Sequence, residues 1–274
     1  MTSHQTSGPA GHSVSHGVNP SASHGASDTI TLLGRSLRHI LRSPDTIVTT
    51  AVTPIVMLAL FVYVFGGAVD TGGGRYVDYL LPGILLITVA SGVAYTSLRI
   101  HTDLASGIFE RFQSMPIARS AVLWGHVVTS LVANLISLVL VVVVAVAIGF
   151  RSGAGVGAWL VVLAIVVLFT LALTWLAVVA GLLARSPDGA GAFAYPLLFL
   201  PFVSSAFVPT AGMPGPVRWF AEHQPVTSIV DAIRGLYAGA AVGGGEVWAA
   251  LAWCAGLLVV AWALGVRTYR RRSA

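Results

Sequence analysis

The side chains that could do chemistry in this chain are few, and they do not form a recognisable catalytic set. The 274 residues include ten Asp or Glu, eight His and fifteen basic residues, all of which are Arg. A phosphate-binding loop of the Walker type needs a Lys to reach the terminal phosphates, so this chain has no such ATPase site. It also lacks a His-Glu-x-x-His metal pair and a Gly-x-Ser-x-Gly nucleophile elbow. These absences disfavour a membrane enzyme or an assembly factor.

The remaining candidates for proton or metal chemistry each have a simpler interpretation. Residues 1–27 are rich in Ser and Gly, and they contain four irregularly spaced His that could bind a metal. They are His4, His12, His16 and His24. Because this segment cannot bury enough apolar surface to offset the entropy of ordering it, we favour a disordered, solvated tail. Similarly, His126 lies near the start of an apolar stretch, where an interfacial position is favoured over a proton relay.

Apolar stretches dominate the rest of the chain. Hydrophobic residues make up 56% of it and charged residues only 9%, whereas a soluble domain has about 25% charged residues. Six stretches are long enough to cross a membrane, which takes about 20 apolar residues. They cover residues 46–67, 79–98, 122–149, 156–184, 189–211 and 247–266. The sequence therefore predicts an all-α membrane protein with six transmembrane helices.

The arginines indicate how these helices are oriented. With the N-terminus in the cytoplasm, four of the fifteen fall in outer segments and the other eleven in inner segments. The outer four are Arg75, Arg151, Arg218 and Arg234. Because cytoplasmic loops carry an excess of basic residues, we expect both termini in the cytoplasm of a bacterium and the spans in its plasma membrane. Membrane topology then explains the net charge of +5, and no nucleic-acid partner is expected.

The predicted spans lack the carboxylates that ion-coupled carriers usually keep inside the membrane. Some carriers bind sodium through carbonyls and hydroxyls alone, so an autonomous secondary transporter or channel stays open. The polar residues inside the spans suit interhelical hydrogen bonds or a mildly polar path, and the first is favoured. They include Asn134, Ser137, Thr170, Thr174, Ser204 and Ser205.

Two cytoplasmic segments have amphipathic patterns. Residues 29–43 place Arg35, Arg38 and Arg42 opposite an apolar face, as expected of a helix lying in the membrane interface or of an ordinary juxtamembrane helix end. In the loop at residues 99–121, Asp103 is expected to cap a short helix that Pro116 follows. That helix could dock into a groove of a cytoplasmic partner or rest on the bilayer.

The outer segment at residues 210–246 is too apolar to extend into water. Its second half predicts a helix with Pro225 in the first turn and one apolar stripe. The stripe comprises Val226, Ile229, Val230, Ile233, Leu236 and Tyr237. Asp231 and Arg234 are three residues apart and are expected to pair on the polar side. We expect this segment to re-enter the outer leaflet or to cap the bundle, because irregular backbone is tolerated there when it is buried in protein.

At four places the sequence resembles the membrane subunits of type-2 ABC exporters, particularly the daunorubicin-resistance permease branch. The resembling segments are residues 54–66 in the first span, 107–125 in the cytoplasmic loop, 204–214 at the end of the fifth span and 224–234 in the outer helix. Together they cover roughly residues 30–270, in the family's order. Gln113 and His126 stand where the family often has Arg, and Gln224 where it often has Asn.

The resemblance implies a division of labour between subunits. A transmembrane domain at residues 28–267, with a basic tail at 268–274, would pair with an identical or related permease chain and with a cytoplasmic ABC ATPase. That ATPase would hold the ATP and Mg²⁺, and this chain would bind no cofactor or metal. Residues 29–43 and 103–116 would contact the ATPase, the latter as the coupling helix. Its expected coupling residues are Asp103, Ile108, Phe109, Glu110, Arg111, Phe112 and Pro116.

The cargo implied by the resemblance is a hydrophobic drug, antibiotic, secondary metabolite or lipid-like molecule. The expected outer cap comprises Pro225, Asp231 and Arg234. Candidate residues for the substrate path are Tyr95, Thr96, Ser205 and Phe207.

Overall fold

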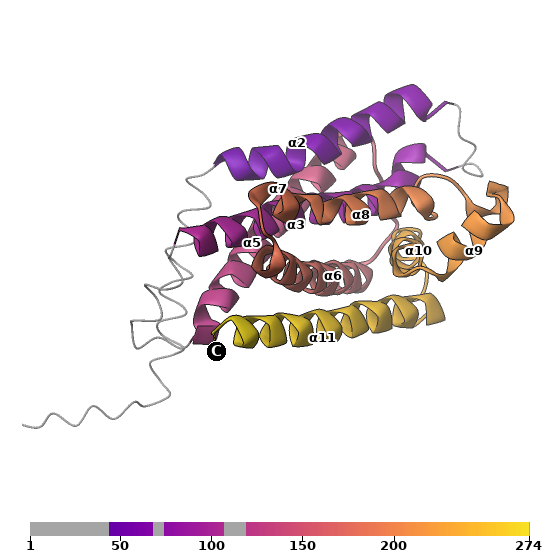
Figure 1. Ribbon diagram of the computed structural model, residues 1–274. Helices are drawn as coiled ribbons and strands as arrows, with labels where there is room; N and C mark the ends of the chain where they lie inside the picture. The colour runs from indigo at the N-terminus through magenta and orange to yellow at the C-terminus, as the bar shows by residue number, and fades with distance from the viewer. Residues whose placement is uncertain (1–43, 68–73, 107–118, 274) are drawn as a thin grey trace, which may run out of the picture.

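The computed structural model describes residues 44–67, 74–106 and 119–273, and every regular element in these ranges is a helix. The all-α prediction is confirmed for this part of the chain. Most of the longer helices run side by side along one direction (Figure 1). The predicted interfacial helix, with Arg35, Arg38 and Arg42, lies outside the described residues.

Four helices are long and apolar enough to cross a membrane, counted over the described ranges. They are α3 (Tyr76–Ala105), α5 (Arg119–Ile148), α6 (Val156–Leu183) and α11 (Gly245–Ser273). A fifth helix, α2 (Pro44–Leu60), continues into a π-helical turn, η1 (Phe61–Phe65), and its apolar part is shorter. The four long helices occupy the second, third, fourth and sixth predicted spans, so the apolar stretches correspond to real helical elements.

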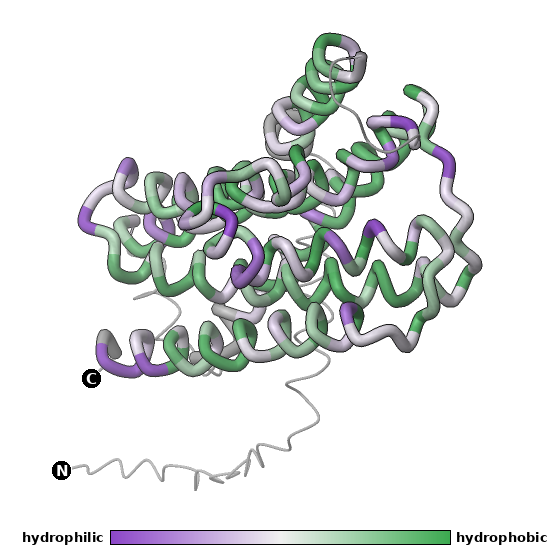
Figure 2. The backbone as a smooth tube through the Cα atoms, turned by 90° about the vertical axis from the view of Figure 1, so that its right-hand side faces the viewer, coloured by the Kyte–Doolittle hydropathy of each residue, from purple (hydrophilic) through white to green (hydrophobic). Residues whose placement is uncertain are grey.

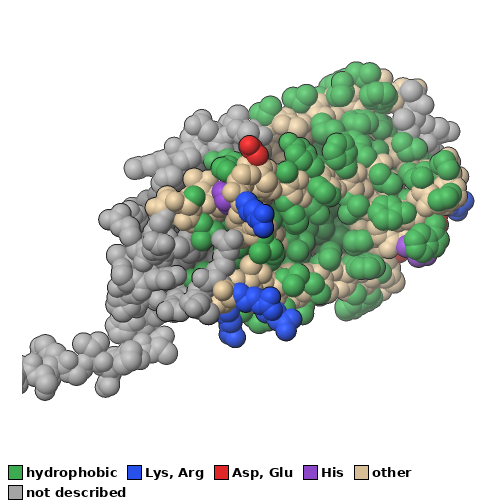
Figure 3. All heavy atoms as spheres, in the orientation of Figure 1, with side chains coloured by type: hydrophobic (Ala, Val, Ile, Leu, Met, Phe, Trp, Pro, Cys, Tyr) green, Lys and Arg blue, Asp and Glu red, His purple; other side chains and the backbone are tan. Residues whose placement is uncertain are grey.

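Hydropathy is distributed along these helices as a bilayer requires. Hydrophobic positions extend along most of their length, and hydrophilic positions gather at their ends (Figure 2). On the face shown in Figure 3, hydrophobic side chains cover the middle while Arg side chains gather at the end where α11 finishes. This pattern suits a multi-pass membrane protein whose middle faces lipid.

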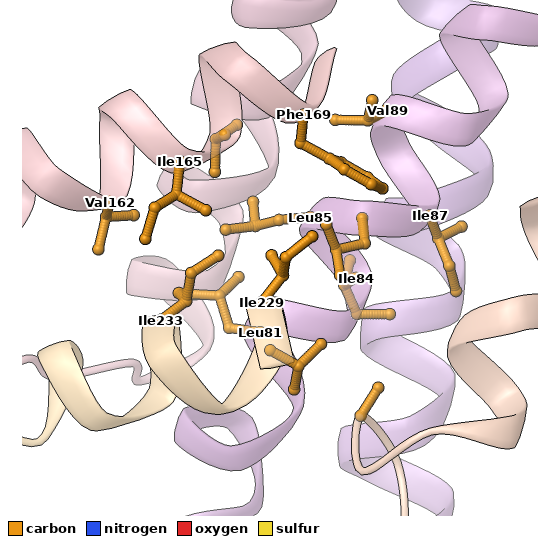
Figure 4. Packing of buried hydrophobic residues seen from close by; sticks show 14 of the residues in the cluster. Leu81, Ile84, Leu85, Ile87, Val89, Val162, Ile165, Phe169, Ile229 and Ile233 are labelled. Carbon is orange, nitrogen blue, oxygen red and sulfur yellow. The ribbon is translucent and has the colours of Figure 1, made fainter. Parts of the chain in front are cut away.

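The central helix of the bundle is α3. It contacts α2, α5 and α6, and also α7 (Pro187–Ala192), α8 (Ala194–Phe199) and α10 (Pro225–Tyr237). Its most apolar 18-residue stretch is 78% buried inside the protein. Leu81, Ile84 and Leu85 of α3 pack against α6 and α10 in the main hydrophobic cluster (Figure 4). Small residues bring neighbouring backbones close: a Cβ at Gly83 would lie 2.6 Å from the Cβ of Ala206.

The fifth predicted span is not one continuous helix. Residues 189–211 instead contain most of α7 (Pro187–Ala192), then α8 (Ala194–Phe199) and a 3₁₀ turn, η2 (Leu200–Val203), before the chain turns. Proline explains the first break, because Pro196 has no N–H to donate to the carbonyl of Ala192, where α7 ends. Pro201 likewise has no N–H to donate to the carbonyl of Leu197 in α8, and η2 follows. The stretch is apolar enough to be read as a span, but its prolines divide it.

The outer segment folds across one end of the bundle. After a short 3₁₀ turn, η3 (Thr210–Gly212), come α9 (Gly215–His223) and α10 (Pro225–Tyr237). In Figure 1, α10 is viewed almost along its axis while α11 lies in the plane, so the two run in different directions. The backbone N–H of Gly153, between α5 and α6, donates to the carbonyl of Tyr237 at 3.1 Å. This bond attaches the end of α10 to the bundle.

Candidate functional site

The apolar stripe predicted for the outer helix is buried, as expected. Ile229, Val230, Ile233 and Leu236 of α10 are fully enclosed, and Val226 is nearly so. Ile229 and Ile233 point between α3 and α6 (Figure 4). Complete burial of such a side chain stabilises a fold by about 1.5–3 kcal/mol. Helix α10 is therefore part of the core and closes one end of the bundle.

Beneath α10 lies a short stretch of non-helical backbone, residues 204–207, which we name the buried turn. The chain leaves helical geometry at Ser204, whose φ and ψ are −132° and −176°. Ser204, Ser205, Ala206 and Phe207 are all buried. Such backbone is stable at membrane depth only if its N–H and C=O groups find partners within the protein.

Side chains on both sides of the turn supply several of these partners. The Gln224 amide, just before α10, donates to the carbonyl of Val203. The backbone N–H of Ser205 donates to Thr227 Oγ1 at 3.4 Å, and that of Ala206 donates to Ser204 Oγ at 3.1 Å. Two of the segments noted above for their resemblance, residues 204–214 and 224–234, are thus in contact.

Arg234 is the most connected of these partners. Its Nη2 donates to the Ser205 carbonyl at 2.8 Å and to the Tyr79 carbonyl at 3.2 Å. Its Nη1 contacts Asp231 Oδ1 at 2.8 Å, which is the pair predicted from the sequence. Asp231 also accepts a bond from Ser205 Oγ at 2.7 Å. The guanidinium therefore links α10, α3 and the buried turn.

The Asp231–Arg234 ion pair lies in a partly buried environment. The Arg234 side chain is 22% exposed and that of Asp231 40%. Burial lowers the pKa of Arg234 below its ordinary value, and the neighbouring Tyr79 and Asp231 offset only part of this shift. The guanidinium carbon also lies 3.8 Å from the centre of the Tyr79 ring, a favourable cation–π geometry. These contacts compensate for the removal of the charge from water.

Two tyrosines at the start of α3 also bond to the turn, and their role is not among the predictions from the sequence. Tyr79 donates its hydroxyl to the Ser205 carbonyl at 2.8 Å, and Tyr76 donates to the Phe207 carbonyl at 3.4 Å. Two tyrosines three residues apart at the start of a predicted span were the available signal. In a membrane protein that signal ordinarily indicates only an interfacial position.

Inside the bundle, polar side chains of α5 form interhelical hydrogen bonds. Ser137 Oγ lies 2.9 Å from Thr50 Oγ1 of α2, and Ser130 Oγ bonds to Thr96 of α3. Asn134 donates to the carbonyl of Ser130 at 3.0 Å within its own helix. These contacts support the favoured interpretation of Ser137 as an interhelical hydrogen-bonding residue. Other polar residues differ, since Thr170 and Thr174 bond to carbonyls of their own helix.

The four candidate path residues occupy two separate regions. Ser205 and Phe207 belong to the buried turn, next to Tyr79. Thr96 is 17 positions further along α3 than Tyr79, which corresponds to about 25 Å at about 1.5 Å per residue. Tyr95 is adjacent to Thr96. The four residues could therefore line a long path through the bundle, but they do not form one local binding site.

At the other end of α3, the structure describes only part of the predicted coupling segment. Asp103 lies inside α3, two residues before its end, so it does not cap a separate helix there. Its Oδ2 is 3.6 Å from Nε2 of His126 at the start of α5. The other predicted coupling residues, Ile108, Phe109, Glu110, Arg111, Phe112 and Pro116, fall between the described ranges. The Asp103–His126 contact therefore joins the two helices that flank this segment.

No metal-like cluster of three or more His, Cys, Asp or Glu side chains occurs in the described ranges. The site around the buried turn is structural: charged and polar side chains, such as Arg234 and Gln224, hydrogen-bond to its irregular backbone.

Comparison with known proteins gives concordant results for sequence families and individual relatives. The family described as ABC-2 type transporter matches residues 27–237. The chain is also similar to the daunorubicin resistance ABC transporter permease protein DrrB1 of Streptomyces coeruleorubidus. The two are 28% identical over 269 residues, which are 95% of this chain and 92% of that protein. The similarity therefore extends over almost the whole of both chains.

Proposed function

The chain belongs to the ABC-2 type transporter family, and from this membership we propose that it is the membrane permease of an exporter driven by a separate cytoplasmic ATPase. The observation that carries the proposal is the family match over residues 27–237, which includes both the cytoplasmic loop and the outer helix. The chain has no Lys and hence no Walker-type loop, so we infer that it is a non-catalytic subunit. ATP and Mg²⁺ would be bound by the partner.

We further propose that the chain crosses a bacterial plasma membrane six times. Helix α2 with η1 would form the first crossing, and α7, α8 and η2 together the fifth. Both termini would then be cytoplasmic, which agrees with the Arg side chains at the end of α11 (Figure 3). In this orientation α9 and α10 lie at the outer side.

The proposed mechanism transmits movement of the ATPase through α3. Helix α3 begins at the buried turn and α10, and it ends two residues after Asp103, beside the predicted coupling segment. A rigid helix with contacts at both ends can couple a displacement on the cytoplasmic side to the outer cap. Two permease chains, identical or related, would enclose a path to which Tyr95, Thr96, Ser205 and Phe207 contribute.

The cargo we propose is a hydrophobic drug, antibiotic or secondary metabolite, or a lipid-like molecule. The support is the resistance permease named above, since that relative is similar along 95% of this chain.

The coupling assignment is tested with the full chain, co-expressed with its ATPase and reconstituted in vesicles. The double substitution Glu110→Ala and Phe112→Ala should leave membrane insertion intact and abolish ATP-dependent export. The matched control is Arg218→Ala, which lies on α9 in the outer segment, and this variant should export normally. Unchanged export by the well-expressed double variant would refute the coupling assignment.

An autonomous secondary transporter or channel is the alternative function. The purified chain, reconstituted alone, distinguishes the two. Flux driven by an ion gradient without any ATPase would favour the alternative, whereas flux that requires ATP and the partner would support the exporter.

A further inference from the structure

An apolar groove lies between α5 and α6, on the half of these helices next to the loop that joins them. Its volume is about 370 Å³. Leu135, Val139 and Val143 of α5 form one wall, and Leu160 and Leu163 of α6 form the other. Val139 and Leu160 are each 61% exposed, so the groove opens to the surroundings of the bundle.

The groove has the length of one membrane leaflet. Along α6 it extends from Val156 to Val166, ten residue steps or about 15 Å at about 1.5 Å per residue. The hydrocarbon core of a bilayer is about 30 Å thick, so this is half of it. The groove reaches from one end of the apolar helices to the middle of the membrane, as a single acyl chain does.

The floor of the groove comes from two other helices. Leu85 of α3 and Tyr237 of α10 form its floor. Tyr237 packs against Phe150 and Trp159, with ring centres 5.1 and 5.0 Å apart. This aromatic cluster lies beside the α5–α6 loop, at the level where aromatic side chains gather in membrane proteins.

Positive charge lies at the end of the groove that faces water. The α5–α6 loop contains Arg151, which is exposed and donates from Nη1 to the carbonyl of Phe150 at 2.9 Å. Arg75 lies next to the same loop, since its Nη1 is 3.6 Å from where a Cβ on Gly149 would stand. One carboxylate, Asp78, contacts Arg75 at 3.4 Å and the backbone N–H of Arg151 at 3.1 Å. Two guanidinium groups and one carboxylate leave a net positive charge.

We propose that this groove binds one acyl chain of an anionic phospholipid, with the phosphate beside Arg75 and Arg151. An apolar channel one leaflet long with a cationic group at its polar end matches the dimensions and the charge of such a lipid. A second copy of this chain would instead need an apolar ridge that fits the groove and an acidic group that faces Arg75 and Arg151. The proposal concerns lipid binding and does not rest on the transport function.

The chain part of the proposal is tested by photolabelling. The full chain, purified in detergent, is incubated with phosphatidylglycerol that carries a diazirine in its acyl chain, irradiated and digested. We expect adducts on peptides from residues 135–143 and 156–166. Val139→Trp should fill the groove and lower this labelling about tenfold. Val259→Trp is the matched control, because Val259 is 64% exposed on α11, and it should leave the labelling unchanged.

The headgroup part is tested by native mass spectrometry with the same phosphatidylglycerol and with phosphatidylcholine. Arg151→Ala should lower phosphatidylglycerol retention about threefold to tenfold, and Arg151→Lys should largely preserve it because the charge is kept. Arg218→Ala, which removes an outer Arg far from the loop, should have no effect. Equal loss of both lipids, or no loss with Arg151→Ala, would refute the phosphate contact.

Three results would overturn the acyl-chain assignment. One is labelling that spreads evenly over all lipid-facing helices, and another is labelling that Val139→Trp does not change. The third is an efficient disulfide between two copies bearing Val139→Cys, which would show that a second chain covers the groove.

Discussion

Arg234 donates from Nη2 to the carbonyl of Ser205, 2.8 Å away, although 29 positions separate the two residues in the sequence. This bond joins the outer helix to a stretch of chain that has left helical geometry. It also explains why a charged residue occurs on a helix that is otherwise part of the core.

Replacing Arg234 should therefore weaken the fold itself. Arg234→Met keeps most of the side-chain volume but leaves the Ser205 and Tyr79 carbonyls short of donors and Asp231 without its cation. We expect a loss of about 2 kcal/mol in the free energy of unfolding, since each unsatisfied buried group costs about 1–3 kcal/mol. Unfolding of the purified chain in mixed micelles measures it.

The control for this substitution is Arg218→Met on α9. Arg218 pairs with Glu222 at 2.7 Å, but both side chains are well exposed. Exposed pairs contribute little, so the unfolding transition should hardly move. Equal effects of the two substitutions would show that the Arg234 contacts do not hold the turn.

Removal of the hydroxyl group from Tyr79 and from Tyr237 should change the free energy of unfolding in opposite directions. The Tyr79 hydroxyl donates to Ser205 at 2.8 Å, so Tyr79→Phe should destabilise the chain by about 1 kcal/mol. The Tyr237 hydroxyl is buried and has no hydrogen-bond partner among the described residues. Tyr237→Phe removes an unsatisfied polar group and should stabilise the chain by up to about 1 kcal/mol. The two variants are compared by unfolding in one detergent, and a shared sign would contradict the assigned contacts.

Gly83 should not tolerate even a methyl group. A Cβ there would lie 2.6 Å from the Cβ of Ala206, which has no rotamer to change, so the buried turn would have to shift. Overpacking of this kind costs about 1–3 kcal/mol, so Gly83→Ala should lower the unfolding midpoint. In contrast, Gly256 on α11 has open space around its Cβ position, and Gly256→Ala should leave the midpoint unchanged or raise it.

Acidification should release the Arg218–Glu222 contact on α9. The hydrogen bond from Arg218 lowers the pKa of Glu222 below its ordinary value. A carboxylate whose pKa is lower in the folded chain contributes stability above its unfolded pKa, and this contribution disappears as the pH falls through the folded pKa. Titration of Glu222 by carbon-13 NMR should show the lowered pKa, and Arg218→Ala should return it towards the ordinary value. An identical pKa in the variant would contradict this origin.

The sequence predicted the helices better than their junctions. The apolar stretches matched by α3, α5, α6 and α11 were visible because lipid exposure imposes a long hydrophobic pattern. The stripe of α10 was visible because helical burial imposes a period of 3.6 residues. Residues 189–211 are equally apolar, so their division by Pro196 and Pro201 could not be distinguished from a kinked helix.

The partners of the buried turn were not predictable in the same way. Arg234, Tyr79 and Gln224 bind backbone carbonyls, and a carbonyl carries no sequence signal of its own. The Asp231–Arg234 pair was found from its spacing, but its burial depends on the position of Ser205. Asp103 was placed at the start of a new helix because Asp is a good N-cap, although the apolar pattern of α3 continues past it.

The buried turn also orders the events of biosynthesis. Its first partners, Tyr76 and Tyr79, are synthesised long before it, but Gln224, Thr227 and Arg234 follow it in the chain. Until α10 has emerged from the ribosome, the backbone groups of the turn lack these later partners. If the fifth predicted span crosses the membrane as proposed, it can settle there only after α10 has emerged. A chain arrested before Arg234 should then be retained by the insertion machinery or degraded.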